Sequence, residues 1–380
     1  MTDGDPIYLD HNATSPILPE VVDAMLPYLR EHFGNPSSTH VHGARARSAV
    51  DRAREQVATL IGCHRDELYF TSGGTEANNL AIRGATEARD DRRGVVTTII
   101  EHPATSRPCA WLERHHWRLA RLGVDASGRT LLAPARDAID EGTALVTVMH
   151  SNNETGVLQP IPELAALAHE AGAWFHTDAA QSVGKVPVDV SALGVDMLSI
   201  AGHKLYAPKG VGALYVKRGT AIAPFVLGAN HERGLRPGTE NVASIVALGA
   251  ACDILGRDLD QAAARMRALR DSLWERLVGA IPEVVWNGGG APLLPNTLNA
   301  RFPRVPGARL LAGASEIVAS TGSACHEGHE TASSVILAMG VAADDALGSV
   351  RLTLGRSTTS AEIARAADAL LRSWRELTAH

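Results

Sequence analysis

Short apolar segments alternate with helix-like segments through the first two thirds of the chain. The apolar segments are rich in Val, Ile, Leu or aromatic residues and are bounded by glycine, proline or polar residues, which is typical of buried strands. Helical patterns such as Thr75–Arg89 and Ile161–Ala171 lie between several of them. The predicted strands are Glu67–Ser72, Val95–Ile100, Ala144–His150, Ala173–Asp178, Met197–Ala201 and Gly212–Val216. This alternation predicts an α/β fold with a mostly parallel sheet covered by helices on both faces.

The pattern changes in the last third of the chain. A long helical pattern covers about Asn241–Ala280, and short strands then mix with helices up to a final helix from about Ala361. The change predicts two domains. We expect a large α/β domain over residues 16–250 and a smaller α+β domain over residues 1–15 and 251–380, with a strand at Ile7–Leu9.

Four arginines lie on a predicted helix over Ala44–Arg54. Apolar residues at helical spacing form the buried stripe of this helix, so the arginines are predicted to lie on its solvated face. A role in binding a partner is the less favoured alternative. The arginines are Arg45, Arg47, Arg52 and Arg54.

Composition narrows the class of protein. The 380 residues are 45% hydrophobic and carry a net charge of −6, which is typical of a globular chain and gives no reason to expect direct nucleic-acid binding. No apolar segment reaches the roughly 18 residues that a membrane helix needs, and the polar N-terminus does not resemble a secretory signal. The cysteines are far apart and form no C-x-x-C pair, so we expect a reducing, cytoplasmic setting. They are Cys63, Cys109, Cys252 and Cys325.

Two segments have residue types suited to binding a phosphate group and a pyridine ring. Ser72-Gly73-Gly74-Thr75 follows a predicted strand and opens a helix, where free N–H groups attract anions. Ordinary helix capping explains this segment equally well. Asp178 ends a predicted strand, where α/β folds bind ligands, and could hold a protonated ring nitrogen. A helix cap or a surface charge is the alternative for Asp178.

Two further segments carry candidate nucleophiles. Lys204 follows Gly202-His203 at a strand end and could form a Schiff base, although most lysines are simply solvated. Cys325 lies among small polar residues and glycines, which predicts an exposed loop. The other three cysteines are interpreted as structural.

Together these segments resemble the cysteine desulfurases, enzymes of the class V aminotransferase group that use pyridoxal 5'-phosphate (PLP). The similarity runs from Tyr8–Thr14 to Val350–Arg356, and its most specific parts are the Gly-His-Lys and Gly-Ser-Ala-Cys segments. The resemblance implies the PLP-dependent transferase fold type I, a homodimer, and a sulfur-acceptor protein as partner. It also implies the conversion of L-cysteine to L-alanine, with a persulfide left on Cys325.

The resemblance assigns roles to individual residues. Lys204 matches the lysine that forms the Schiff base, Asp178 the partner of the pyridine nitrogen, and His102 the residue stacked on the ring, with an acid–base role. Arg351 matches the arginine that grips the substrate carboxylate, and Asn35 is a weaker candidate for the same end of the substrate. The remaining implied cofactor-binding residues are Asn153 and Gln181 near the ring 3-hydroxyl, and Gly74, Thr75, His203 and the partner subunit's Thr239 at the phosphate.

The chain departs from the family pattern at one position. Ala201 stands where serine is usual, so one hydrogen bond to the phosphate, worth about 0.5–1.5 kcal/mol, is missing or replaced. Cys325, His326 and His329 could also suggest a metal site, but their spacing is not a strong zinc pattern and we assign no metal ligands.

Several alternatives stay open on the sequence alone. Selenocysteine lyase is the main one, and aminotransferase-like or β-lyase activity and a non-catalytic PLP-fold scaffold are the others. The sulfur acceptor is also open, because iron–sulfur assembly, tRNA thiolation and DNA phosphorothioation all use such enzymes. The run from Thr321 to Gly328 resembles the phosphorothioation branch.

Overall fold

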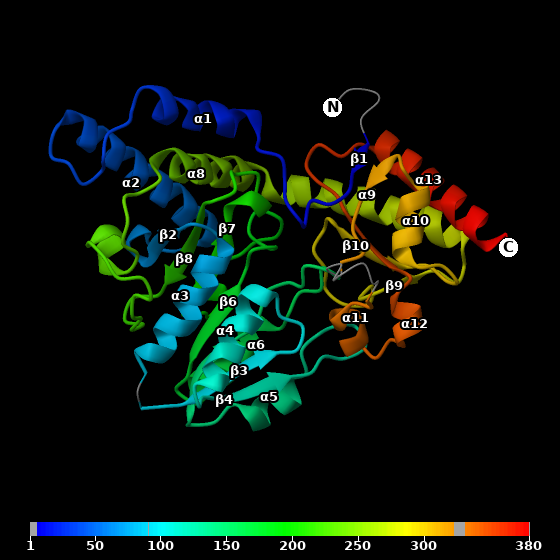
Figure 1. Cartoon of the computed structure of the whole chain (residues 1–380), viewed down its shortest axis with the longest axis horizontal. Coiled ribbons are helices and arrows are strands. Elements are labelled where there is room, and N and C mark those ends of the chain that lie inside the picture. The colour runs from blue at the N-terminus through cyan, green and yellow to red at the C-terminus, as the bar shows by residue number, and fades with distance from the viewer. Residues whose placement is uncertain (1–5, 90, 323–330, 380) are drawn as a thin grey trace.

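A seven-stranded sheet forms the centre of the larger part of the molecule (Figure 1). The computed structural model describes residues 6–89, 91–322 and 331–379, so Cys325, His326 and His329 lie outside the described residues. The strand order is β2 (Leu68–Thr71), β8 (Gly212–Val216), β7 (Met197–Ala201), β6 (Trp174–Asp178), β5 (Thr143–Thr147), β3 (Gly94–Thr98) and β4 (Arg118–Leu122). Strand β8 is antiparallel to both neighbours, and the pairs from β7 to β4 are parallel. The predicted mostly parallel sheet is confirmed.

Helices cover both faces of this sheet, because successive strand residues point to opposite sides. Val95 and Leu145 pack with α3 (Gly74–Glu87) and α4 (Pro103–Arg114) on one face. Their chain neighbours Val96 and Val146 join the core on the other face. That second core includes residues of α2 (Val41–Ile61), α6 (Ile161–Glu170) and α8 (Val242–Arg257), and α1 (Pro19–Arg30) packs on α8.

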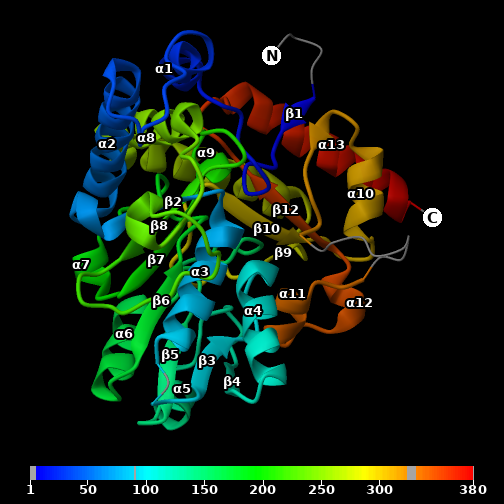
Figure 2. The same ribbon diagram turned by 60° about the vertical axis from the view of Figure 1, so that its left-hand side comes forward.

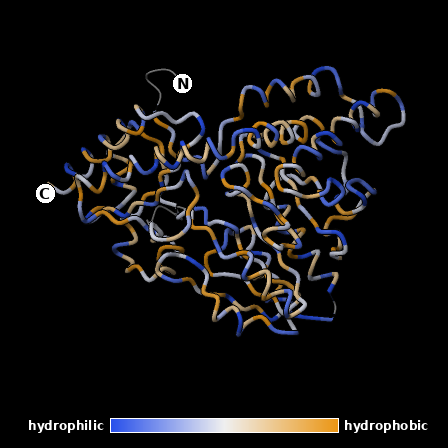
Figure 3. The backbone as a smooth tube through the Cα atoms, turned by 180° about the vertical axis from the view of Figure 1, so that it is seen from behind, coloured by the Kyte–Doolittle hydropathy of each residue, from blue (hydrophilic) through white to orange (hydrophobic). Residues whose placement is uncertain are grey.

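The smaller part is built on a three-stranded antiparallel sheet beside the first (Figure 2). Its strands are β12 (Ser349–Thr353), β10 (Thr297–Arg301) and β9 (Val285–Trp286). The packed helices are α9 (Leu259–Ala280), α10 (Gly307–Gly313) and α13 (Ser360–Thr378), and α13 alternates apolar and polar residues at helical spacing (Figure 3). The N-terminal strand β1 (Ile7–Tyr8) pairs with β11 (Ile317–Val318), and Ile7 lies in this second core.

Short elements complete the described chain. They are α5 (Leu132–Ala138), α7 (Val190–Leu193), α11 (Ser334–Ala338), α12 (Ala343–Ala346) and the 3-10 turns η1 (Arg65–Glu67), η2 (Gly202–Lys204) and η3 (His231–Gly234). Across the described ranges, we find no helix long and apolar enough to cross a membrane.

Two expectations about local structure are wrong in detail. The helical pattern over residues 241–280 is not one helix, because Asp258 leaves helical geometry (φ −139°) and separates α8 from α9. The carboxylate of Asp258 instead accepts hydrogen bonds from Arg356. Strand β4 was not predicted, because its sequence Arg-Leu-Ala-Arg-Leu lacks an apolar run and it forms the edge of the sheet.

The prediction that all four arginines of α2 face solvent is wrong for Arg54. Its side chain is buried, and its two terminal nitrogens donate to the two carboxylate oxygens of Glu232 at 2.8 and 2.6 Å. Arg54 also donates to the carbonyl of Leu68 in β2. Because the partner lies 178 positions away in the sequence, helical spacing alone could not reveal the pair.

Candidate active site

A cavity of about 330 Å³ lies at the carboxyl ends of β6 and β7, where the second sheet meets the first. Parallel α/β sheets place ligands at this edge because the strand ends and helix N-termini converge there. Nine residues singled out from the sequence line it: Gly74, Thr75, His102, Asn153, Asp178, Gln181, His203, Lys204 and Arg351.

One end of the cavity is suited to an anion. The N-terminus of α3, a helix of 14 residues, opens into it with Gly74 and Thr75. A side chain at Gly74 would crowd Ala201, because a Cβ there would lie 3.1 Å from the Ala201 Cβ. His203 lies at the same end, and its Nδ1 is 3.2 Å from the hydroxyl of Thr14. Burial and then the charge of Lys204 lower the pKa of His203 to about 4, so the ring is neutral.

At the other end, the Asp178 carboxylate is held by two donors. Its Oδ2 accepts from Asn78 Nδ2 at 2.6 Å, and its Oδ1 accepts from the backbone N–H of Ala180 at 2.9 Å. His102 caps α4, because its Nδ1 accepts from the Ala104 N–H at 3.1 Å. Burial lowers the pKa of His102. Because Nδ1 accepts from the Ala104 N–H, the ring proton lies on Nε2.

Lys204 reaches into the cavity from η2, directly after β7. Its Nζ donates to the backbone carbonyls of Asn12 and Ala13, both at 2.6 Å. Burial and the nearby Arg351 lower the pKa of Lys204 to about 8. A larger fraction of its amine is therefore uncharged near neutral pH than in an ordinary lysine, as a nucleophilic lysine requires.

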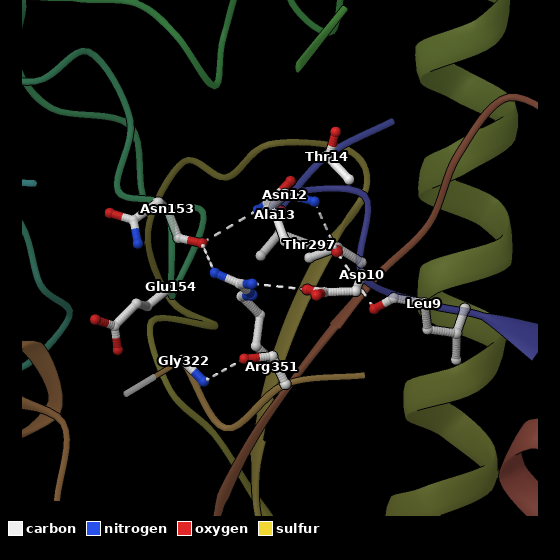
Figure 4. A network of polar contacts seen from close by, with 12 residues as sticks. Leu9, Asp10, Asn12, Ala13, Thr14, Asn153, Glu154, Thr297, Gly322 and Arg351 are labelled. Carbon is white, nitrogen blue, oxygen red and sulfur yellow. Dashed lines mark hydrogen bonds and ion pairs between the residues drawn. The ribbon is translucent and has the colours of Figure 1, made fainter. Parts of the chain in front are cut away.

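Arg351 projects into the cavity from β12 of the smaller sheet (Figure 4). One terminal nitrogen donates to the Asn153 carbonyl at 3.1 Å, and the other pairs with the Asp10 carboxylate at 2.7 Å. The buried Nε has no hydrogen-bond partner among the described residues. The arginine is thus held in place by the protein at the wall of the cavity.

Two residues singled out from the sequence are not part of this cavity, and a third lies outside the described residues. Asn35 is exposed in the loop between α1 and α2, where its Oδ1 accepts from the Ser37 N–H. Thr239 is exposed after η3. Cys325 lies outside the described residues, so its position relative to Lys204 stays a prediction.

The structure adds three residues that the sequence reasoning missed. Asn78 lies one helical turn beyond Thr75, so the helical spacing could have revealed it. Asn12 and Lys185 show no such signal, since the contact that joins them spans 173 positions. Lys185 is buried beside Gln181 and Asn12. In the described residues, no group of three or more His, Cys, Asp or Glu side chains could hold a metal ion.

Comparison with known proteins agrees with this geometry. Residues 7–366 match the family model described as aminotransferase class-V. A cysteine desulfurase of Gluconacetobacter diazotrophicus is 44% identical over 96% of this chain and 92% of its own length. Among solved structures, a NifS-like protein superposes with a TM-score of 0.90 at 32% identity, covering 97% of this chain and 98% of its own. A structure of SspA in complex with cysteine gives a TM-score of 0.81 at 33% identity, covering 93% of this chain and 100% of its own.

These relatives favour the desulfurase interpretation over the selenocysteine lyase alternative. The match to the family model spans both sheets and every residue that lines the cavity. The predicted fold type and the dependence on PLP are confirmed with it. The chain belongs to the class-V aminotransferase family and, within it, to the PLP-dependent cysteine desulfurases.

Proposed function

We propose that the protein removes sulfur from L-cysteine with PLP held in the cavity between the two sheets. The observation that carries this proposal is that Lys204, Asp178 and the N-terminus of α3 all face one cavity. The set of chemical groups fits PLP: an anion site, an amine for its aldehyde, and a carboxylate for its pyridine nitrogen. The small residues Gly74 and Ala201 leave the anion end open.

The residues around the cavity would hold protons at defined atoms. When bound, PLP supplies an electron-withdrawing ring that stabilises negative charge on the substrate carbon. Asp178 would keep the pyridine nitrogen protonated, and Asn78 and the Ala180 N–H hold its carboxylate in position. His102 would exchange a proton through Nε2, because its Nδ1 accepts from the Ala104 N–H.

Arg351 would orient the substrate by its carboxylate. A guanidinium group binds a carboxylate with two parallel hydrogen bonds, which sets direction as well as affinity. Asp10 and the Asn153 carbonyl hold the guanidinium group in position at the wall of the cavity. The substrate would enter with its carboxylate toward β12 and its amino group toward Lys204.

The sulfur would be transferred to Cys325. Its thiolate attacks the sulfur of L-cysteine, a sulfur–sulfur bond forms, and the bond between Cβ and sulfur breaks with its electron pair left on carbon. Protonation of that carbon gives L-alanine, and Cys325 is left as a persulfide, so no external oxidant or reductant is needed. The role of Cys325 rests on its Gly-Ser-Ala-Cys sequence context.

Replacement of Cys325 by serine tests this assignment. We expect normal PLP binding, while release of alanine from L-cysteine falls to near zero, because a hydroxyl is a much poorer nucleophile toward sulfur than a thiolate. The measurement is alanine release by the variant beside the parent, with Cys63→Ser as the matched control. Equal rates in Cys325→Ser and the parent would place the nucleophile elsewhere and revive the lyase alternative.

A homodimer is part of the proposal. Phe33 in the loop after α1 is 78% exposed and Leu227 is 85% exposed, and such apolar side chains are suited to burial in an interface. Thr239 is exposed and outside the cavity of its own chain, which suits a residue that completes the site of a partner subunit. Light scattering coupled to gel filtration tests this, and a fully active monomer would contradict it.

The partner that receives the sulfur is proposed only by its chemistry, as a protein with an acceptor thiol. Iron–sulfur assembly, tRNA thiolation and DNA phosphorothioation remain the three candidate routes. A cytoplasmic location is proposed from the cysteines, since the three in the described chain are free thiols: Cys63, Cys109 and Cys252. Capture of the acceptor from cells by the persulfide-bearing enzyme would identify the route.

A further inference from the structure

Lys185 is a buried lysine next to the proposed cofactor site. It lies in the turn that follows β6, four residues after Gln181, and its relative exposure is 5%. Its Nζ donates to Gln181 Oε1 at 3.0 Å and to Asn12 Oδ1 at 3.3 Å. No carboxylate in residues 6–89, 91–322 and 331–379 forms an ion pair with it. Buried lysines normally have such a partner, so this one calls for another explanation.

The hydrogen bonds around Gln181 settle which way its amide group points. A protonated lysine nitrogen can only donate, so the Gln181 atom facing Lys185 must be the oxygen. A backbone carbonyl can only accept, so the atom facing the Asn12 carbonyl, at 2.9 Å, must be the nitrogen. The two partners give the same orientation independently of one another.

The same reasoning applies to Asn12. Its Oδ1 accepts from Lys185 and from Asn296 Nδ2, and its Nδ2 donates to Thr297 Oγ1 at 3.0 Å. The backbone carbonyl of Asn12 accepts hydrogen bonds from both Gln181 Nε2 and Lys204 Nζ. Lys185 thus contacts Asn12, whose carbonyl accepts from Lys204, and Gln181, which donates to the same carbonyl.

We propose that Lys185 is a positioning residue that holds the Gln181 amide with its NH₂ group facing the cofactor ring. One N–H of Gln181 goes to the Asn12 carbonyl, and the second is free to donate to the oxygen on carbon 3 of the ring. This inference rests on the proposed place of Gln181 beside that oxygen.

Loss of Lys185 would let the amide turn over. Glutamine amide nitrogen and oxygen have nearly the same shape, so only hydrogen bonds distinguish the two orientations. In the reversed orientation an acceptor would face the ring oxygen, which carries negative charge in the bound cofactor, and the donor would be lost. Burial and the charges of Lys204 and Arg351 lower the pKa of Lys185 to about 7. The protonated side chain can only donate to Gln181, whereas the neutral amine also carries a lone pair that can accept, so the positioning role belongs to the protonated form.

The test is a double-mutant cycle on Lys185→Met and Gln181→Leu. The readouts are the dissociation constant of PLP and the absorbance maximum of bound PLP in the absence of substrate. We expect each single variant to weaken PLP binding by about tenfold, the scale of one lost hydrogen bond to a charged group. The double variant should bind PLP no more weakly than Gln181→Leu alone, because Lys185 acts through Gln181. Lys217→Met, at an exposed position, is the matched control and should match the parent.

Each outcome decides the question. Unchanged PLP affinity and absorbance in Lys185→Met, or losses that add in the double variant, would overturn the positioning role. Unchanged affinity in Gln181→Leu would instead show that Gln181 does not bind the cofactor, a failure of the proposed site itself. If Lys185→Met does not fold, Lys185→Gln is measured in its place. It keeps a polar group in the buried site but replaces the obligatory donor by an amide that can also accept.

Discussion

Replacing Glu232 by glutamine should destabilise the protein far more than breaking an exposed ion pair. The Arg54 and Glu232 side chains are 9% and 3% exposed, and the guanidinium and carboxylate are joined by two hydrogen bonds. Glu232 also accepts from the Phe70 N–H at 2.9 Å, and Arg54 lies 4.7 Å from the centre of the Phe70 ring. The pair therefore joins α2, β2 and the segment of η3 that leads to Thr239.

The magnitude follows from burial. Removing one member of a buried pair leaves the other charge without compensation and costs about 3–5 kcal/mol. The exposed pair Arg218–Asp66 has comparable geometry, at 2.6 Å, but its side chains are 58% and 52% exposed. A pair of that kind contributes little because solvent screens it, so Asp66→Asn is the matched control.

Equilibrium unfolding in urea measures the difference, with all variants at one protein concentration and saturated with PLP. Glu232→Gln should lower the unfolding free energy by at least about 2 kcal/mol more than Asp66→Asn does. The double variant Arg54→Met/Glu232→Leu should recover part of the loss, because an apolar pair leaves no buried charge but leaves the buried Phe70 N–H without its acceptor. Equal effects of Glu232→Gln and Asp66→Asn would refute the claim that burial makes this pair important.

Four further outcomes are expected. Lys204→Ala should abolish both the absorbance band of bound PLP and alanine release, and normal turnover by this variant would contradict the assignment of the Schiff-base lysine. The rate at which the apoprotein incorporates PLP should rise as pH rises through about 8, because burial lowers the pKa of Lys204 to about 8 and only the neutral amine reacts. Stopped-flow absorbance measures this rate, and a rate that does not change with pH would contradict the prediction. Thr239→Ala should weaken the retention of PLP in the dimer, measured by dialysis and fluorescence. Unchanged retention would show that Thr239 does not reach the site of a partner subunit. Arg351→Lys should raise KM for L-cysteine by about 10- to 100-fold while PLP affinity changes little, because lysine lacks the planar fork; an unchanged KM would remove the carboxylate role.

The sheet and one half of the site could be predicted because their signals are local. Strands β7 and β8 have the predicted bounds, since glycine or polar residues interrupt the apolar run at their ends. Asp178 ends β6 and Lys204 follows β7, and because the carboxyl ends of these strands meet at one edge of the sheet, strand pattern alone brings the two residues together. The glycines and Thr75 that follow a predicted strand likewise indicated the start of a helix, and α3 begins at Gly74.

The other features depend on long-range contacts that no local pattern encodes. Asp10 meets Arg351 across 341 positions, and Lys185 meets Asn12 across 173. The burial of Arg54 depends on Glu232, which has a left-handed backbone (φ 44°) that places its carboxylate against β2. Resemblance to a family assigned Arg351 its role, but only the fold reveals the acidic partner that holds it.

The two parts of the molecule contribute different chemistry to the cavity. Asp178, Lys204 and the start of α3 come from the seven-stranded sheet and its connections, and they meet the atoms expected of the cofactor. Arg351 comes from the three-stranded sheet and meets the end expected of the substrate. Asn12 connects the two sets, because its backbone carbonyl accepts from Lys204 while its backbone N–H donates to Thr353 of β12. A shift of the smaller sheet would therefore change the distance between the substrate carboxylate and the amine of Lys204, while the contacts of Asp178 would stay as they are. We therefore expect changes at the junction between the sheets to alter the affinity for the substrate more than the affinity for the cofactor.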